Sequence, residues 1–139
     1  MTIDSENSVV ALCVAGMERE GTPDEARRLF EQAWAARRDD YDACIAAHYL
    51  ARHQPTPEET LRWNAAAARH AEAVGDGRAD GLLASLYLNL ADSLLAMGNP
   101  TEAAAVARRA EAHLVAVPDG GYRDRVAFGI RRLEGRLGL

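Results

Sequence analysis

Histidine and acidic side chains are the residues of this chain whose types could support chemistry. His48 and His53 lie five positions apart in one expected helix, which separates them by about 140° around the helix axis. Zinc-binding histidines of one helix are instead spaced so that both face the metal, as in the HExxH motif. The acidic pair Glu58-Glu59 fits the first turn of a helix better than a general acid and base. We therefore predict no metal site, no cofactor and no catalytic residue.

The two cysteines, Cys13 and Cys44, are 31 residues apart and form no CxxC pattern. Each falls at an apolar position of a separate expected helix, and unoxidised cysteine is among the most buried residue types. Cysteines that hold a metal or belong to a disulfide framework usually show a recognisable spacing. We interpret both side chains as reduced thiols in the core.

The same helix-start signal occurs three times in the chain. Each copy has a residue that can cap a helix, then a proline at the first helical position, then a glutamate that can bond back to the cap. The copies are separated by 34 and 43 residues, and a period in this range is typical of stacked helical repeats. They are Thr22-Pro23-Asp24-Glu25, Thr56-Pro57-Glu58-Glu59 and Asn99-Pro100-Thr101-Glu102.

Apolar residues recur at the spacing of amphipathic helices along the whole chain, and no segment alternates as a half-buried strand would. Proline and glycine residues separate the periodic segments, so the connections between helices are short. At 139 residues, the chain has the length of one domain. The pattern predicts a single all-α domain over residues 1–139. Its expected helices span residues 5–20, 22–38, 41–53, 56–74, 79–97, 99–117 and 122–137.

The stretch from Ala84 to Val115 resembles the tetratricopeptide repeat (TPR), and the longer spacing of the later copies resembles the long-helix type found in bacterial regulatory proteins. The resemblance implies a right-handed α-solenoid of about seven antiparallel helices, or roughly three and a half hairpins. Neighbouring hairpins stack in such arrays because one hairpin cannot bury its own apolar face. The residues that stand at the characteristic positions of the repeat are Tyr87, Leu90, Ala91, Leu94, Gly98, Glu102, Ala103, Ala107 and Ala110.

Some positions depart from the TPR pattern. Leu94 and Ala107 stand where the family has aromatic residues, and in the middle unit Thr60 and Asn64 stand at the small and aromatic positions. The TPR pattern therefore specifies the pairing of helices least clearly in this middle repeat, which contains the second proline-led signal.

Composition and charge exclude several classes of function. A chain with a net charge of -5 is not attracted electrostatically to a phosphate backbone, so we expect no nucleic acid partner. No apolar run is long enough to span a bilayer, and the N-terminus lacks the basic region of a signal peptide, so we expect a cytoplasmic protein without a membrane partner. All 16 cationic residues are arginine, which favours a GC-rich bacterial source.

The TPR resemblance implies a binding surface on the first helices of the hairpins, which line the concave side of the array. If exposed, Leu88 and Leu95 would form an apolar patch that marks an interface. The alternative is that the nominated residues contact only solvent or a neighbouring helix. The nominated partner-binding residues are Tyr49, Arg52, Ser85, Leu88, Asp92, Leu95, Phe128 and Arg131.

Arginine is concentrated in the last expected helix. Residues 119–139 contain 5 arginines and 3 acids, whereas residues 1–60 contain 6 arginines and 12 acids. These arginines could clamp an acidic partner, or they could solvate the outer side of a helix whose charges Asp124 and Glu134 partly offset.

Three hypotheses of function follow from the sequence. The first is a non-catalytic scaffold that captures a peptide or helix of another protein in its groove. The second is a self-associating module, a homodimer through the terminal helix. An enzyme is the least expected, since it would require a pocket where groups such as His48, Tyr49 and Asp92 converge.

Overall fold

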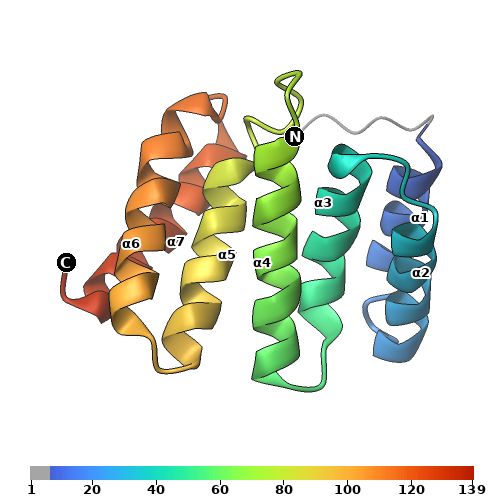
Figure 1. Cartoon of the computed structure of the whole chain (residues 1–139), viewed down its shortest axis with the longest axis horizontal. Coiled ribbons are helices and arrows are strands. Elements are labelled where there is room, and N and C mark those ends of the chain that lie inside the picture. The colour runs from blue at the N-terminus through green and yellow to red at the C-terminus, as the bar shows by residue number, and fades with distance from the viewer. Residues whose placement is uncertain (1–6) are drawn as a thin grey trace. The chain divides into compact units, whose positions relative to one another are not determined.

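The computed structural model describes residues 7–139, and all regular structure in that range is helical (Figure 1). This confirms the all-α prediction. None of the described helices combines the length and apolar character needed to cross a membrane. The elements are α1 (Ser8–Met17), α2 (Pro23–Ala35), α3 (Asp40–Leu50), η1 (Ala51–His53), α4 (Pro57–Ala73), α5 (Leu83–Ala96), α6 (Pro100–His113), η2 (Leu114–Ala116) and α7 (Gly121–Leu137), where η denotes a short 3-10 helix.

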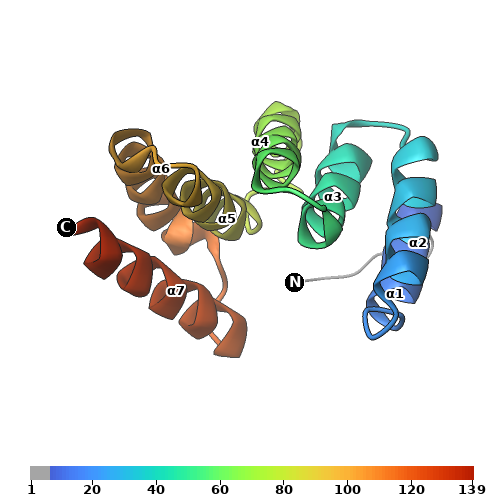
Figure 2. The same cartoon turned by 90° about the horizontal axis from the view of Figure 1, so that it is seen from below.

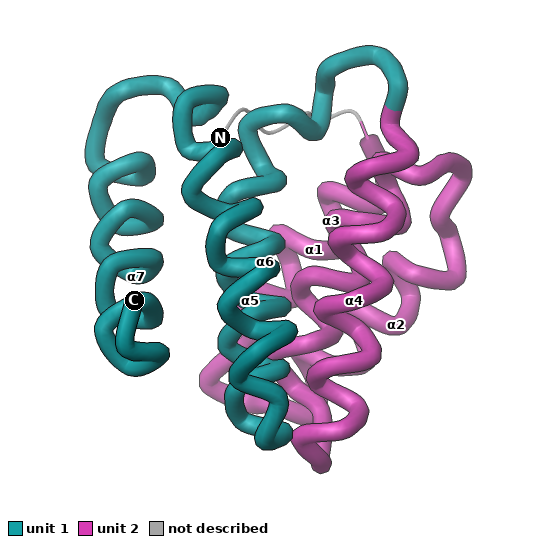
Figure 3. The backbone as a smooth tube through the Cα atoms, turned by 60° about the vertical axis from the view of Figure 1, so that its left-hand side comes forward, with its two compact units in different colours: residues 1, 75–139 teal, residues 2–74 magenta. Residues whose placement is uncertain are grey.

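The described residues divide into two compact units (Figure 3). Residues 7–74, drawn in magenta, form the N-terminal unit with α1 to α4, and residues 75–139, drawn in teal, form the C-terminal unit with α5 to α7. The division falls directly after α4. A single domain over residues 1–139 stays a prediction.

Two helical hairpins build the N-terminal unit. α1 pairs with α2, α3 pairs with α4, and α3 also contacts both helices of the first hairpin. Phe30 of α2 is fully buried, and its ring stacks on Tyr49 and on His53 with centroids 5.3 Å and 5.6 Å apart. Trp34 and Trp63 meet edge to face at 4.9 Å and connect α2 to α4. Aromatic contacts thus link consecutive hairpins of this unit.

The C-terminal unit consists of one hairpin and a third helix that covers it. α5 and α6 form the hairpin, and α7 contacts both of them (Figure 2). α7 directs Val126, Ile130 and Leu133 inward, and all three are buried. These residues follow the i, i+4, i+7 spacing of one helix face, so the apolar stripe expected from the sequence is the stripe that packs.

The three proline-led signals all lie where helices begin, at the first residues of α2, α4 and α6. Only one copy makes the expected side-chain cap, in which the amide of Glu59 donates to Thr56 Oγ1 at 3.2 Å. Thr56 has the extended ψ of 150° that capping needs, whereas Thr22 and Asn99 have ψ of 85° and 67° and make no side-chain cap. The predicted helix starts are confirmed, and the predicted caps are wrong at two of them.

Several helices are shorter than the sequence predicts. The third expected helix changes to η1 at Ala51, and the helical residues end at His53 because Pro55 disfavours the α region for Gln54, which is extended. The fifth begins at Leu83 rather than near residue 79, after a turn through Gly77, whose φ of 85° favours glycine. The expected start of the first helix at residue 5 lies outside the described residues.

Both cysteines are buried and reduced, as predicted. Burial, together with the nearby negative charge of Asp42, raises the pKa of the Cys13 thiol to about 12. A thiol that stays protonated at neutral pH is a poor nucleophile and a poor metal ligand. Cys13 therefore belongs to the core rather than to a reactive site.

Two helical glycines give opposite predictions for the same substitution. A Cβ at Gly16 of α1 would lie 2.3 Å from the buried ring of Phe30, whereas a Cβ at Gly135 of α7 would meet nothing within 4 Å. We expect Gly16→Ala to lower the free energy of unfolding by about 1–3 kcal/mol through overpacking. Gly135→Ala should raise it by about 0.5–1 kcal/mol through helix propensity. Urea unfolding of both variants tests this, and a Gly16→Ala variant at least as stable as the wild type would contradict the packing of α1 on α2.

Candidate functional site

Two of the residues predicted to bind a partner, Tyr49 and Arg52, lie in the N-terminal unit, and they differ in their exposure to solvent. Tyr49 of α3 is buried and stacks on Phe30, so it serves the core rather than the expected binding surface. Arg52 of η1 is exposed, but it is engaged within the chain. Its guanidinium pairs with Glu20 at 3.0 Å and lies 5.7 Å from the centre of the Tyr49 ring. The structure therefore leaves no apolar anchor at these two positions.

In the C-terminal unit, α7 contacts two of the polar residues nominated on α5, half-buried Ser85 and exposed Asp92. The Tyr122 hydroxyl donates to Ser85 Oγ at 3.0 Å, and Arg136 pairs with Asp92 at 2.9 Å. Both contacts progress in the same direction along the two helices, so α7 runs parallel to α5. Ser85 and Asp92 thus hold α7 in register rather than facing a groove.

The proposed apolar patch of Leu88 and Leu95 is not exposed. Leu88 lies against α7 at Gly129, where an added Cβ would be 2.8 Å from Leu88 Cδ2, and both leucines are half-buried. The sequence predicted their place on a second apolar row of α5 correctly but not the helix that covers it. Glycine at position 129 lets the two helices approach closely.

Phe128 and Arg131 are exposed nominated residues that, unlike Arg52 and Asp92, form no ion pair within residues 7–139. The Phe128 side chain is 57% exposed, and Arg131 is exposed as well. Arg132, which the sequence did not nominate, lies with its guanidinium carbon 6.0 Å from the centre of the Phe128 ring. This distance is at the outer limit of a cation–π contact.

Residues on the side of α7 opposite its buried stripe form a surface that we call the α7 outer face. A helix advances about 100° per residue, so positions three, four and seven apart share one side. The helical spacing of these residues from Phe128 is therefore the sequence pattern that could have identified them as one surface. All of its members are exposed, and they include one acid, Asp124, beside the three arginines. The α7 outer face consists of Gly121, Asp124, Arg125, Phe128, Arg131, Arg132 and Gly135.

Charge on α7 is only partly neutralised within the chain. Arg123 pairs with Asp119 at 2.8 Å, and Arg136 pairs with Asp92. Glu134, which the sequence predicted to offset the arginines of this helix, interacts electrostatically with Arg131. Within residues 7–139, no carboxylate lies at ion-pairing distance from the three arginines of the α7 outer face. The face therefore presents three arginines without a close ion pair, and the carboxylate of Asp124, around an exposed ring.

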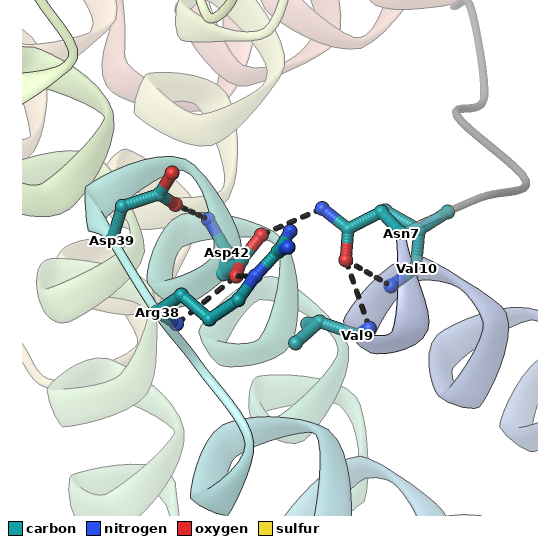
Figure 4. Close-up of polar contacts among 6 residues, drawn as sticks. All are labelled: Asn7, Val9, Val10, Arg38, Asp39 and Asp42. Carbon is teal, nitrogen blue, oxygen red and sulfur yellow. Dashed lines mark hydrogen bonds and ion pairs between the residues drawn. The ribbon is translucent and has the colours of Figure 1, made fainter.

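A buried polar network in the N-terminal unit was not predicted from the sequence (Figure 4). Asp42 of α3 is fully buried, and its carboxylate accepts hydrogen bonds from Asn7 Nδ2 at 2.7 Å and from Arg38 N and Nε at 3.0 Å and 2.9 Å. Asn7 also caps α1 by accepting from the Val9 amide at 2.8 Å. This network joins the start of α1 to the start of α3.

The protonation of Asp42 follows from these contacts. Burial alone would raise the pKa of the carboxyl, but hydrogen bonds from Arg38 and Asn7 to the charged form outweigh it and hold the pKa below its usual value. A carboxylate that is saturated with donors and ionised at neutral pH is a poor general acid. The network is suited to holding helices together rather than to proton transfer.

The histidines also make structural contacts. His53 lies 2.8 Å from Glu20, and His70 lies 2.8 Å from Asp40. Burial, with a smaller effect of the Arg52 charge, lowers the pKa of His48 to about 4. In the part of the chain that the structure describes, no group of three His, Cys, Asp or Glu side chains is arranged to hold a metal.

Comparison of the chain with protein-family models, with curated proteins and with solved structures found no match.

The pKa of His48 predicts a loss of stability in mild acid. The folded state keeps this imidazole neutral down to about pH 4, whereas an unfolded chain protonates it near 6.5. The unfolded state therefore binds more protons as the pH falls through this window, and stability present above it is lost. We expect the difference in unfolding free energy between the wild type and His48→Gln to shrink by about 1–2 kcal/mol from pH 7 to pH 5. Urea unfolding at both pH values measures it, and a constant difference would contradict the burial of His48.

A second prediction concerns two glutamates that face each other across α6 and α7. Burial, followed by a hydrogen bond and charge repulsion from Glu111, raises the pKa of Glu134, while Arg131 opposes the shift. A raised pKa means that Glu134 contributes most to the stability of the folded state when it is protonated. This stabilisation is lost as the pH rises through the raised pKa. Glu134→Gln should therefore raise the thermal midpoint slightly at pH 7 and hardly at all at pH 4. Glu111→Gln should give the same gain without adding to it in the double variant.

Proposed function

We propose that this chain is a non-catalytic, TPR-like protein-binding module that acts in the cytoplasm and captures a peptide or helix of a partner protein. The observation that carries the proposal is the 57% exposed ring of Phe128 on the α7 outer face. Large aromatic residues, together with arginine, supply most of the free energy of binding at protein interfaces. An exposed ring beside unpaired arginines is therefore a candidate anchor.

The packing within each unit supports a repeat architecture, which we propose is a right-handed α-solenoid. In the C-terminal unit, α7 runs parallel to α5 and contacts both helices of the α5–α6 hairpin. In the N-terminal unit, α3 contacts both helices of the α1–α2 hairpin in the same way. A first helix that packs on the whole preceding hairpin is the arrangement expected of stacked helical repeats.

The polar groups of the described residues favour binding over catalysis. Asp42 is held in its charged form by three donors, and His53 and His70 each lie against a carboxylate. Asp92, the acid expected in a catalytic arrangement, is instead paired with Arg136 of the same unit. These side chains are engaged in contacts that hold helices together.

The proposal predicts that a single ring on α7 carries much of the binding. Peptides selected from a displayed random library for binding to the whole chain should bind Phe128→Ala at least about tenfold more weakly, because truncation of an interface aromatic typically removes this much affinity. Isothermal titration calorimetry measures the effect.

Val115→Ala is the matched control for this experiment. Val115 is 80% exposed in η2 and lies outside the α7 outer face, so its truncation removes exposed apolar surface elsewhere. Selected peptides that bind both variants as tightly as the wild type would contradict the proposed function. Far-UV circular dichroism shows whether each variant keeps its helicity.

A further inference from the structure

We propose that the partner of the α7 outer face is an acidic amphipathic helix of another protein. In this assignment, which rests on the proposed function, an apolar side chain of the partner packs on Phe128, and its carboxylates pair with the surrounding arginines. The argument for the occupant is the charge of the face and the placement of that charge around the ring.

Arginines flank Phe128 on both sides. At about 100° per residue, Arg125 and Arg132 lie about 60° and 40° to one side of Phe128, and Arg131 lies about 60° to the other, where exposed Asp124 lies about 40° from the ring. A partner helix whose apolar stripe is bordered by glutamate or aspartate, above all on the edge that meets Arg125 and Arg132, presents the complementary pattern. Arginine is also the residue best suited to hold carboxylates, because its guanidinium can donate two parallel hydrogen bonds.

The arginines of the α7 outer face are available to the carboxylates of a partner, whereas the other arginines of α7 form ion pairs within the chain. Arg123 and Arg136 are held by Asp119 and Asp92, whereas the three arginines of the face have no such carboxylate within residues 7–139. A partner carboxylate would therefore gain an ion pair without breaking one inside the chain. Arg132 is also positioned against the ring by its contact with Phe128, so part of the pairing geometry exists before binding.

Gly135 provides an independent sign that another helix approaches here. It lies about 20° from Phe128 around the helix, in the last turn of α7, where glycine is a poorer helix former than alanine. Gly129 on the inner side is explained by the close contact of Leu88, but nothing lies within 4 Å of a Cβ placed at Gly135. No contact inside the chain requires a small residue at this position, whereas a closely packed partner helix would.

A second copy of the chain is the alternative occupant of this face. In a symmetric antiparallel pairing centred on Phe128, Arg131 of one copy would lie near Arg125 of the other, and such juxtaposed like charges oppose association. Asp124 of one copy would lie near Arg132 of the other in the same pairing. The test below therefore includes the oligomeric state as an outcome.

The test begins with a displayed library of amphipathic helices whose flanking charges are randomised, selected against the whole chain. We expect enrichment of glutamate and aspartate beside the apolar stripe, and binding that weakens with salt. The variant Arg125→Glu/Arg131→Glu/Arg132→Glu should bind the selected peptides at least about tenfold more weakly and should select basic peptides instead. The matched control is Arg28→Glu/Arg62→Glu/Arg69→Glu, which reverses three exposed arginines of the N-terminal unit and should leave both the affinity and the selected composition unchanged.

Substitutions at Gly135 provide a second experiment, which separates effects on binding from effects on folding. Gly135→Gln improves helix propensity but adds bulk to the face, so it should keep or raise the thermal midpoint while weakening the selected peptides about fivefold or more. Gly135→Ala should weaken them less. Equal binding by both variants would overturn the close approach of a helix.

Other outcomes distinguish this inference from the proposed function. Peptides that require Phe128 but show no acidic bias would overturn the inference and leave the protein-binding role intact. Selected peptides that do not require Phe128 would overturn both. Displacement of the selected peptides by an equal concentration of single-stranded DNA would assign the face to phosphate, and a dimer that Phe128→Ala abolishes would assign it to a second copy; each would overturn the inference.

Discussion

The structure depends on one constraint, which is that each helix is apolar on one side and can hide that side only against another helix. Helices of 10 to 17 residues are marginal in isolation, so packing rather than intrinsic propensity makes them stable. Full burial of one valine, leucine or isoleucine side chain contributes about 1.5–3 kcal/mol. The three buried residues of α7, Val126, Ile130 and Leu133, therefore supply part of the free energy that this helix lacks in isolation.

Polar contacts then select one arrangement among the many that would bury the same apolar area. In the N-terminal unit, Asp42 ties the beginning of α1 to that of α3 through Asn7. In the C-terminal unit, the contacts of α7 with Ser85 and Asp92 fix its direction and register along α5. A buried carboxylate without its donors would be destabilising, so these residues specify register more than they add stability.

Local signals allowed most of the helices to be predicted from the sequence. Proline at the first helical position and an apolar stripe are readable within one segment, and they placed all three marked helix starts and the inward-facing residues of α7. The contacts that could not be predicted join segments that are far apart in the sequence. Asn7 and Asp42 are 35 residues apart, and nothing near either residue in the sequence indicates the other.

The candidate site was predictable only where a residue's environment depends on its own helix. Phe128 and Arg131 were nominated and are exposed, because α7 alone decides which of its sides faces outward. Leu88 and Tyr49 were nominated on equal grounds but are covered by residues from other helices. Sequence periodicity indicates which residues share a side, but it does not indicate whether a later helix will pack on that side.

The two sides of the last helix call for different explanations. Its inner side repeats the apolar pattern of α5 after a shift of 43 residues, so it docks on the hairpin as a first helix of a repeat would. Its outer side departs from that pattern by placing a large ring and three arginines where a merely solvated helix needs only small or charged residues. Stability explains the inner side, and it does not explain an exposed phenylalanine beside an unneeded glycine. These two residues are the reason for proposing that the outer side of α7 binds another protein.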